Sequence, residues 1–284
     1  MKLLYCSDLH GDEVQYQRLN AVAGELCPDA IVLGGDMLPD DSALVPEQMG
    51  RMQPHFVTEH FRSAILRLKE ASGQAEVLFI FGNHDWGSSV PAMEALAEEG
   101  VLSILDHKRP TAVGGVHFLG YPYTPPTSWY VKDFERLDEP GDRPPLLGGA
   151  RWNSRFSRVG THGAATLFEN EVAIADDLAE MAAPPDPWVF VAHAPPSDCD
   201  LDCTYDRMPR GSRAVRHAIE RLQPLLSLHG HVHESPRVSE RVQECFGKTL
   251  AINVGQESAM LHCAEIEIDV AAGAVARFEH RQQS

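Results

Sequence analysis

Residues 76–85 read EVLFIFGNHD, an apolar run that ends in a short polar cluster. The run 76–81 is too continuously apolar for a strand with one face in water, so we expect a central strand that is covered on both faces of its sheet. Gly82-Asn83-His84-Asp85 follows at once. In open α/β folds the carboxyl ends of parallel strands carry the ligand-binding side chains. This stretch therefore predicts both a buried strand and a functional loop.

The same alternation extends in both directions along the chain. Apolar runs at 2–6 and 30–33 flank a helical pattern at 12–26 and predict right-handed parallel units. Further short strands are expected at 116–120, 188–192, 225–228, 249–254, 263–270 and 274–280, and helices at 56–68, 166–181 and 212–222. Two facing, mostly mixed sheets with helices outside both accommodate these elements. We predict an α/β fold, a four-layer α/β/β/α sandwich, as one domain over residues 1–284.

Polar clusters at the ends of apolar runs recur along the chain. The five clusters are Asp8-Leu9-His10, Gly35-Asp36, Gly82-Asn83-His84-Asp85, His193 and Gly230-His231-Val232-His233. Each one alone has an ordinary explanation as a turn, a cap or a solvated loop. Together they supply carboxylate, amide and imidazole ligands, which suit Mn, Fe, Zn or Ni better than Ca. Their joint occurrence predicts a dinuclear metal site at the carboxyl ends of the strands.

The order of these clusters resembles the calcineurin-like metallophosphoesterase family, whose pattern runs DxH, GD, GNH followed by an acidic residue, a lone His and GHxH. Residues 191–196 and 229–234 extend the likeness to a small bacterial and archaeal branch of that family, and it spans roughly residues 1–270. The chain departs from the pattern after Asp36. An acidic residue often follows three positions on in the family, whereas this chain has Pro39, with Asp40 and Asp41 just beyond.

The resemblance implies a role for each cluster. It assigns Asp8, His10 and His233 to one metal ion, Asn83, His193 and His231 to the other, and Asp36 to both. A hydroxide held between the ions would attack phosphorus. His84 would protonate the leaving group while Asp85 orients its ring, although packing beside Asn83 is an alternative role for His84.

An insert at about 121–163 interrupts the regular pattern. It is rich in proline, glycine, aromatic residues and arginine, including Tyr123, Trp129, Tyr130, Trp152, Arg151, Arg155 and Arg158. A long segment of this kind inside a compact domain is commonly functional or mobile. We expect it to fold over the metal site and to contact the organic part of the substrate.

Composition limits the partners. The formal net charge of −17 opposes binding of bulk nucleic acid, but metal ions in a site can still attract a small phosphorylated substrate. The apolar stretch at the start of the sequence is too short for a signal peptide, because Asp8 follows it closely. No apolar run approaches the length that spans a membrane, so we expect a cytoplasmic protein without a membrane partner. Its six scattered cysteines are expected to be free thiols. Nothing in the sequence indicates an oligomeric state.

These patterns predict a metal-dependent phosphoric ester hydrolase with two divalent or trivalent ions. A phosphodiesterase acting on a small or nucleotide-like ester is the favoured interpretation. Two alternatives stay open at this point. One is a phosphomonoesterase, and the other is a noncatalytic metal-binding scaffold or regulatory module of the same fold.

Overall fold

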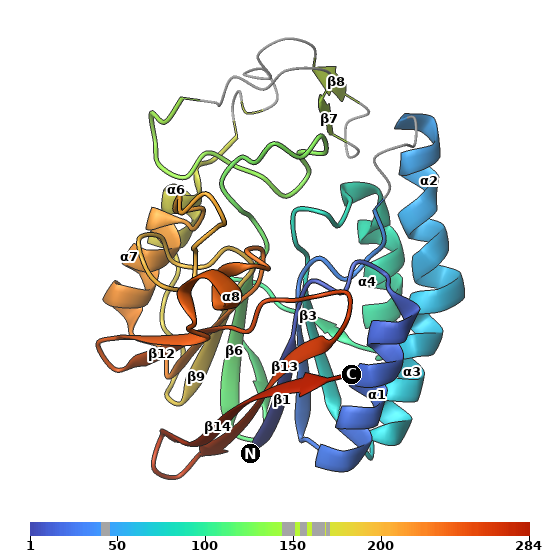
Figure 1. Cartoon of the computed structure of the whole chain (residues 1–284), viewed down its shortest axis with the longest axis vertical. Coiled ribbons are helices and arrows are strands. Elements are labelled where there is room, and N and C mark those ends of the chain that lie inside the picture. Colours follow the sequence, from blue (N-terminus) through green and yellow to red (C-terminus); the bar gives the residue numbers. More distant parts are fainter. Residues whose placement is uncertain (41–45, 144–150, 154–157, 161–167, 169–170) are drawn as a thin grey trace.

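Two six-stranded sheets form the centre of the protein (Figure 1), whose computed structural model describes residues 1–40, 46–143, 151–153, 158–160, 168 and 171–284. The first sheet has the order β14 (Ala274–Gln283), β13 (Leu261–Asp269), β1 (Lys2–Cys6), β2 (Ala30–Gly34), β3 (Glu76–Ile80) and β4 (Ser103–Ile104). The second has the order β11 (Gln243–Phe246), β12 (Thr249–Asn253), β10 (Leu226–His229), β9 (Trp188–Ala192), β6 (Val116–Tyr121) and β5 (Thr111–Val113). A separate antiparallel pair consists of β7 (Arg151–Asn153) and β8 (Arg158–Gly160).

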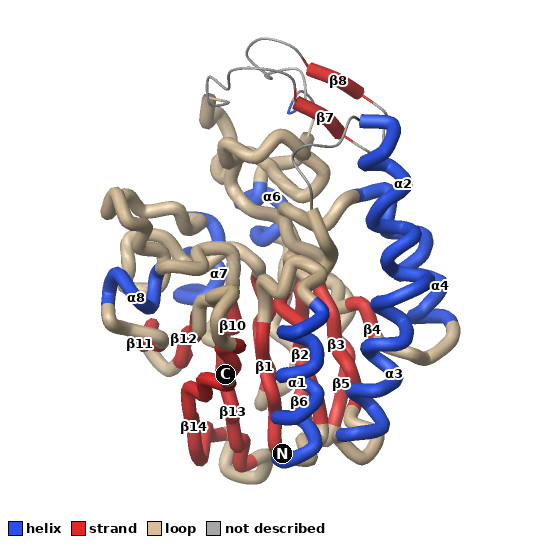
Figure 2. The backbone as a smooth tube through the Cα atoms, turned by 45° about the vertical axis from the view of Figure 1, so that its right-hand side comes forward, coloured by secondary structure: helices blue, strands red, loops and turns tan. Residues whose placement is uncertain are grey.

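Both sheets are mixed. In the first, β1, β2, β3 and β4 run parallel, while β13 and β14 add an antiparallel hairpin at one edge. In the second, β12, β10, β9 and β6 run parallel, and β11 and β5 are antiparallel edge strands. The carboxyl ends of the parallel strands of both sheets therefore lie at one end of the molecule, below the segment that carries β7 and β8 (Figure 2).

Strand residues alternate between two cores. Leu3 and Tyr5 of β1 point into the core between the sheets, whereas Leu4 and Cys6 point to the outer face, where helices cover them. This period of two explains why the central strands read as continuous apolar runs, since both of their faces are buried.

Helices cover the outer face of each sheet. Along the chain they are α1 (Glu13–Leu26), α2 (Pro46–Phe56), the π-helical turn η1 (Val57–Phe61), α3 (Arg62–Ala71), the 3₁₀ turn η2 (Gly87–Ser89), α4 (Val90–Glu98), α6 (Ile174–Ala179), α7 (Arg213–Leu222) and α8 (Ser235–Ser239). The helices α1, α3 and α4 pack on the first sheet, and α6 and α7 pack on the second (Figure 1). The predicted four-layer α/β/β/α sandwich is confirmed.

Local signals account for the helix boundaries. Asp12 caps α1 by accepting hydrogen bonds from the backbone N–H groups of Val14 and Gln15, and Ser212 caps α7 through the N–H of Val215. The helix predicted at 166–181 is interrupted. Residue 168 is helical, residues 171–173 are not, and Ile174–Ala179 form α6. Residues 166, 167, 169 and 170 lie outside the described part of the chain.

None of the helices in the described part of the chain combines the length and the apolar character needed to cross a membrane.

Candidate metal centre

The predicted ligands converge from both sheets at one point. Asp8 and His10 follow β1, Asp36 follows β2, and Asn83 follows β3, while His193 follows β9 and the two histidines of the last cluster follow β10. Two groups of potential ligand atoms share Asp36, with all ligand atoms of a group within 4.8 Å of one another. The first group is Asp8, His10, Asp36 and His233, and the second is Asp36, His193 and His231.

Close contacts between ligand atoms define the first group. Nε2 of His233 lies 3.1 Å from Oδ1 of Asp8 and 3.3 Å from Nε2 of His10. Burial raises the pKa of Asp8, but the charge and the hydrogen bond of His233 outweigh burial and bring that pKa to about 2. Asp8 is therefore ionised at neutral pH. Its other oxygen, Oδ2, is buried without a hydrogen-bond partner.

His193 lies against two carboxylates of the cluster. Its Nδ1 lies 2.8 Å from the carbonyl of Gly34, which fixes the proton on that nitrogen. In the neutral ring the lone pair of Nε2 then faces Oδ2 of Asp36 at 3.1 Å, with Oδ1 of Asp8 4.0 Å away. In that neutral form two acceptors face each other without a proton between them. Burial lowers the pKa of His193, but the nearby carboxylates raise it to about 9, so in the absence of metal a proton occupies this gap. A metal ion fits the same position.

The amide of Asn83 completes the second group. Its Oδ1 lies 2.8 Å from Nδ1 of His231, and its Nδ2 is buried without a partner. Burial, followed by the charge of His193, lowers the pKa of His231 to about 3. The ring is therefore neutral, which is the form that binds metal.

Four residues of the site have a strained backbone conformation. Asp8, His10, Asp36 and His231 have φ values of 60°, 46°, 53° and 68°, in the left-handed region that residues other than glycine rarely adopt. Such conformations cost about 1–3 kcal/mol each and persist where the surroundings impose them, often at functional sites. Gly82 allows the close packing, because a Cβ there would collide with Oδ1 of Asp36 and with Nε2 of His193. The residues present fit a dinuclear centre in their donor types, in their unpaired buried atoms and in their spacing.

His84 lies beside this cluster but is held by a different residue from the one we predicted. Oδ2 of Asp40 contacts Nδ1 of the His84 ring and lies 3.6 Å from Nδ1 of His10. Both oxygens of Asp85 instead accept backbone N–H groups, from Asp36 at 3.0 Å, Leu38 at 2.9 Å and Gly82 at 2.9 Å. Asp85 therefore binds the backbone of the turns around the site, and the carboxylate in contact with the His84 ring is that of Asp40.

Comparison with known proteins agrees with this chemistry. The model of the calcineurin-like phosphoesterase family matches residues 1–235. The chain belongs to this family. Among curated proteins, no match was found.

Solved structures share the fold of this calcineurin-like phosphoesterase at low identity. One aligns over 100% of this chain and 99% of its own with 16% identity and a TM-score of 0.61. The protein TT1561 of Thermus thermophilus aligns over 99% of this chain and 97% of its own, with 16% identity and a TM-score of 0.53. A putative 5′-nucleotidase from Staphylococcus aureus aligns over 98% of this chain and 53% of its own, with 14% identity and a TM-score of 0.51. At these identities the likeness concerns the fold.

Asp40 lies where the chain departs from the family pattern after Asp36. Pro39 occupies the position at which an acidic residue is expected, and the carboxylate of the next residue, Asp40, contacts His84. Gln53 of α2 helps to position this loop, because its Nε2 donates to the carbonyl of Pro39 at 2.9 Å and to that of His84 at 2.7 Å. No sequence signal identified Gln53, which lies in a polar stretch of a helix.

Trp129 of the insert contacts His84, which lies beside the metal-ligand cluster. Its ring stacks on the His84 imidazole with centroids 4.1 Å apart and an interplanar angle of 17°. Trp152 and Val131 pack with Trp86, directly after the third motif, and the N–H of Gly87 donates to Asp133 at 2.7 Å. Arg155 lies outside the described residues, and for Arg151 and Arg158 only the backbone is described.

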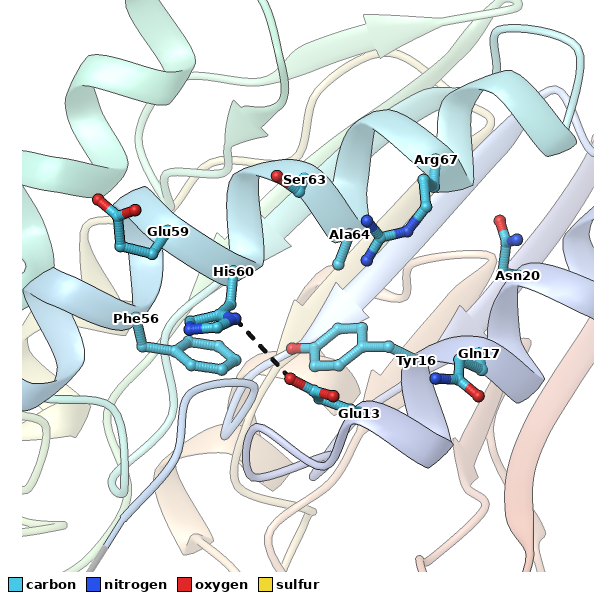
Figure 3. Close-up of a pocket in the computed structure, with 10 residues that line it drawn as sticks. All are labelled: Glu13, Tyr16, Gln17, Asn20, Phe56, Glu59, His60, Ser63, Ala64 and Arg67. Atoms are coloured by element: carbon cyan, nitrogen blue, oxygen red, sulfur yellow. Dashed lines mark ion pairs between the residues drawn. The ribbon is translucent and has the colours of Figure 1, made fainter.

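A groove elsewhere on the surface has no part in this cluster. It has a volume of about 440 Å³ and lies between α1 and the helical stretch 56–67 (Figure 3). The Glu13–His60 ion pair, with 3.7 Å between Oε1 and Nδ1, crosses it. No residue of the two metal-binding groups lines it. The candidate site is therefore identified by its cluster of carboxylate and imidazole groups, and not by the volume of a surface groove.

Proposed function

We propose that the chain is a metal-dependent phosphoric ester hydrolase that acts on a phosphodiester or another small, nucleotide-like ester. The observation that carries this proposal is the arrangement around His193, where ionised carboxylates and a fixed imidazole lone pair converge on a space that needs a cation. His84 adds a proton donor beside that space. Family membership supports hydrolysis of a phosphoric ester.

The residues that would hold two ions are those of the two groups. They are Asp8, His10 and His233 for one ion, Asn83, His193 and His231 for the other, with Asp36 common to both. Mn, Fe, Zn or Ni suits this mixture of oxygen and imidazole donors. When bound, such ions lower the pKa of a coordinated water and neutralise charge on the phosphate oxygens.

His84 has the position of a leaving-group acid. Asp40 engages its Nδ1, so the proton that His84 can give to a leaving oxygen is the one on Nε2. Burial lowers the pKa of His84, but the charges of Asp36 and Asp40 together with the hydrogen bond outweigh burial, and the net shift is upward. The upward shift of the pKa favours the charged ring, and the contact with Asp40 fixes its direction, as proton donation requires.

Trp129 suggests what the substrate carries. Its half-buried indole stacks on His84, and Tyr130 packs against it with centroids 4.3 Å apart. A leaving group that approaches His84 therefore lies close to the aromatic rings of Trp129 and Tyr130. Stacking of a base on an aromatic ring contributes about 1–3 kcal/mol in single-stranded nucleic-acid binders. An ester with a planar organic group gains binding free energy from contact with these rings, whereas inorganic phosphate or a small alkyl ester does not.

Kinetics on a panel of esters test the proposal. The metal-loaded protein should hydrolyse bis-nitrophenyl phosphate and nucleotide diesters faster than nitrophenyl phosphate, a monoester. His84→Ala should keep its metal content and lose about 100- to 10,000-fold in turnover of esters with alkoxide leaving groups. The deficit should shrink for nitrophenolate, which leaves without a proton.

Each alternative predicts a different result. A phosphomonoesterase would reverse the order of the two nitrophenyl substrates. A noncatalytic scaffold would bind two metal ions and yet show no turnover above that of the metal-free protein on any ester. An equal deficit of His84→Ala on all leaving groups would show that His84 supports the structure instead of donating a proton.

A further inference from the structure

A second pair of histidines lies at the edge of the first sheet, outside the metal-ligand groups. His262 belongs to β13 and His280 to the edge strand β14. Both line a cavity of about 370 Å³ between this hairpin, α8 and the segment before β13. The other polar side chains in its wall are His233, Arg237, Glu240, Glu257 and Gln282.

The two imidazoles are spaced as ligands of one ion. In the antiparallel register His262 faces Gln282 and Ala264 faces His280, so the two rings meet diagonally across the hairpin. Nδ1 of His262 lies 3.2 Å from Nε2 of His280. Two nitrogens that each lie about 2.0–2.1 Å from a tetrahedral ion are about 3.3 Å apart. The pair therefore needs almost no movement to bind a metal.

Burial favours the form of the two rings that can bind a metal ion. His262 is only 5% exposed, and the ring nitrogen that faces His280 is its Nδ1. Burial lowers the pKa of both rings, that of His280 to about 4, which favours the neutral form that binds metal.

Glu257 supplies an anionic group in the same cavity. Its carboxylate is close enough for its charge to act on His262, although the ligand atoms of the three residues are not all within 4.8 Å of one another. Glu257 is half-buried and lines the same cavity as the two histidines. We propose that His262, His280 and Glu257 bind one divalent ion of borderline hardness, such as Zn²⁺ or Co²⁺, in a site separate from the dinuclear cluster.

The site is linked to the cluster through Gln256. Oε1 of Gln256 accepts from the N–H of His262 at 2.9 Å, and its own N–H donates to the carbonyl of His233 at 3.3 Å. Its Nε2 donates to the carbonyl of Ser7, next to Asp8, at 3.2 Å. An ion bound by His262 and Glu257 would therefore restrict the motion of Gln256. Through the hydrogen bonds of Gln256 it would also restrict the backbone at Ser7, next to Asp8, and at His233.

Metal counting on the full chain tests the proposal. The protein is stripped with a chelator, dialysed against Co²⁺ and measured by elemental analysis. His280→Gln, a half-buried position where folding tolerates change, should bind one equivalent less than the wild type. Glu257→Gln should bind the same ion with a Kd raised roughly tenfold or more. His60→Gln, a control whose side chain is 54% exposed in the separate groove, should bind as many equivalents as the wild type.

A second readout separates a lost site from a damaged fold. Zn²⁺ should raise the Tm of wild type and of His60→Gln by more than it raises the Tm of His280→Gln, since the variant lacks one site that binds only the folded state. The proposal is overturned if His280→Gln binds as many equivalents as the wild type. It is also overturned if that variant loses two or more equivalents, because the pair would then belong to the cluster.

Discussion

Replacement of Asp40 by asparagine measures what the carboxylate beside His84 contributes to turnover. Asparagine keeps the size of the side chain and one acceptor oxygen but removes the charge, so the contact with Nδ1 of His84 loses its ionic part. Hydrogen bonds to charged groups contribute about 1.5–3 kcal/mol, and about 1.4 kcal/mol corresponds to a factor of ten in rate. We expect kcat for an alkyl diester to fall roughly 10- to 100-fold.

The assay compares diesters whose leaving groups range from alkoxide to nitrophenolate. The deficit of Asp40→Asn should shrink as the leaving group becomes more acidic, because it arises through the proton on His84. In a His84→Ala background the same substitution should have little further effect, since residues that act as a unit are not additive. Asp186→Asn serves as the control, because this carboxylate is 63% exposed and pairs with Lys248 at 3.4 Å.

Three results would refute the reasoning. A deficit that is equal for all leaving groups would show that Asp40 does not act through proton donation. A full loss in the His84→Ala background would show that it acts independently of His84. Loss of metal from Asp40→Asn would place its main role at His10, whose Nδ1 lies 3.6 Å away.

Three further substitutions test other parts of the site. Asp36→Ala should abolish hydrolysis and release at least one metal ion, because this carboxylate is common to both groups; near-native metal content with turnover would contradict the assignment. Trp129→Ala should raise KM for a nucleotide-like ester by about one to two decades while turnover of a small diester stays within a few-fold, and equal losses on both substrates would mean that the stack only supports the fold. Lys132→Met should lower the free energy of unfolding by about 3–5 kcal/mol, measured by urea denaturation, because it leaves the fully buried Glu135 carboxylate without the ammonium that lies 2.6 Å away; a change below about 1 kcal/mol would contradict this.

The positions of the ligands along the chain followed from local patterns. Apolar runs such as 76–81 mark strands buried on both faces, and the polar residue that follows each run lies at its carboxyl end. Parallel strands bring such ends to one edge of a sheet. For the same reason the four layers could be predicted, since the central strands of both sheets have to bury both faces.

The partner of His84 could not be read from the chain order. Asp85 follows His84 directly, yet consecutive side chains in the turn after β3 point in different directions, and this carboxylate accepts the N–H groups of Asp36, Leu38 and Gly82. Asp40 reaches the ring from the loop after β2. Which loop meets which side chain depends on the strand order and on the path of each loop, and no local pattern encodes either.

The amino-acid sequence alone determined the residue types, the strand ends at which they stand and therefore the donor set proposed for the metal ions, because hydrophobic periodicity and donor type are properties of short segments. The tertiary structure alone supplied the pairings across the molecule: Asp40 with His84, Trp129 over the same ring, and His262 beside His280. These contacts join residues that are far apart in the chain or offset across a hairpin. The Asp40–His84 contact arises because β2 and β3 are neighbours in one sheet, and the His262–His280 contact because β13 pairs with β14. Only the Trp129–His84 stack needs loops from both sheets to meet.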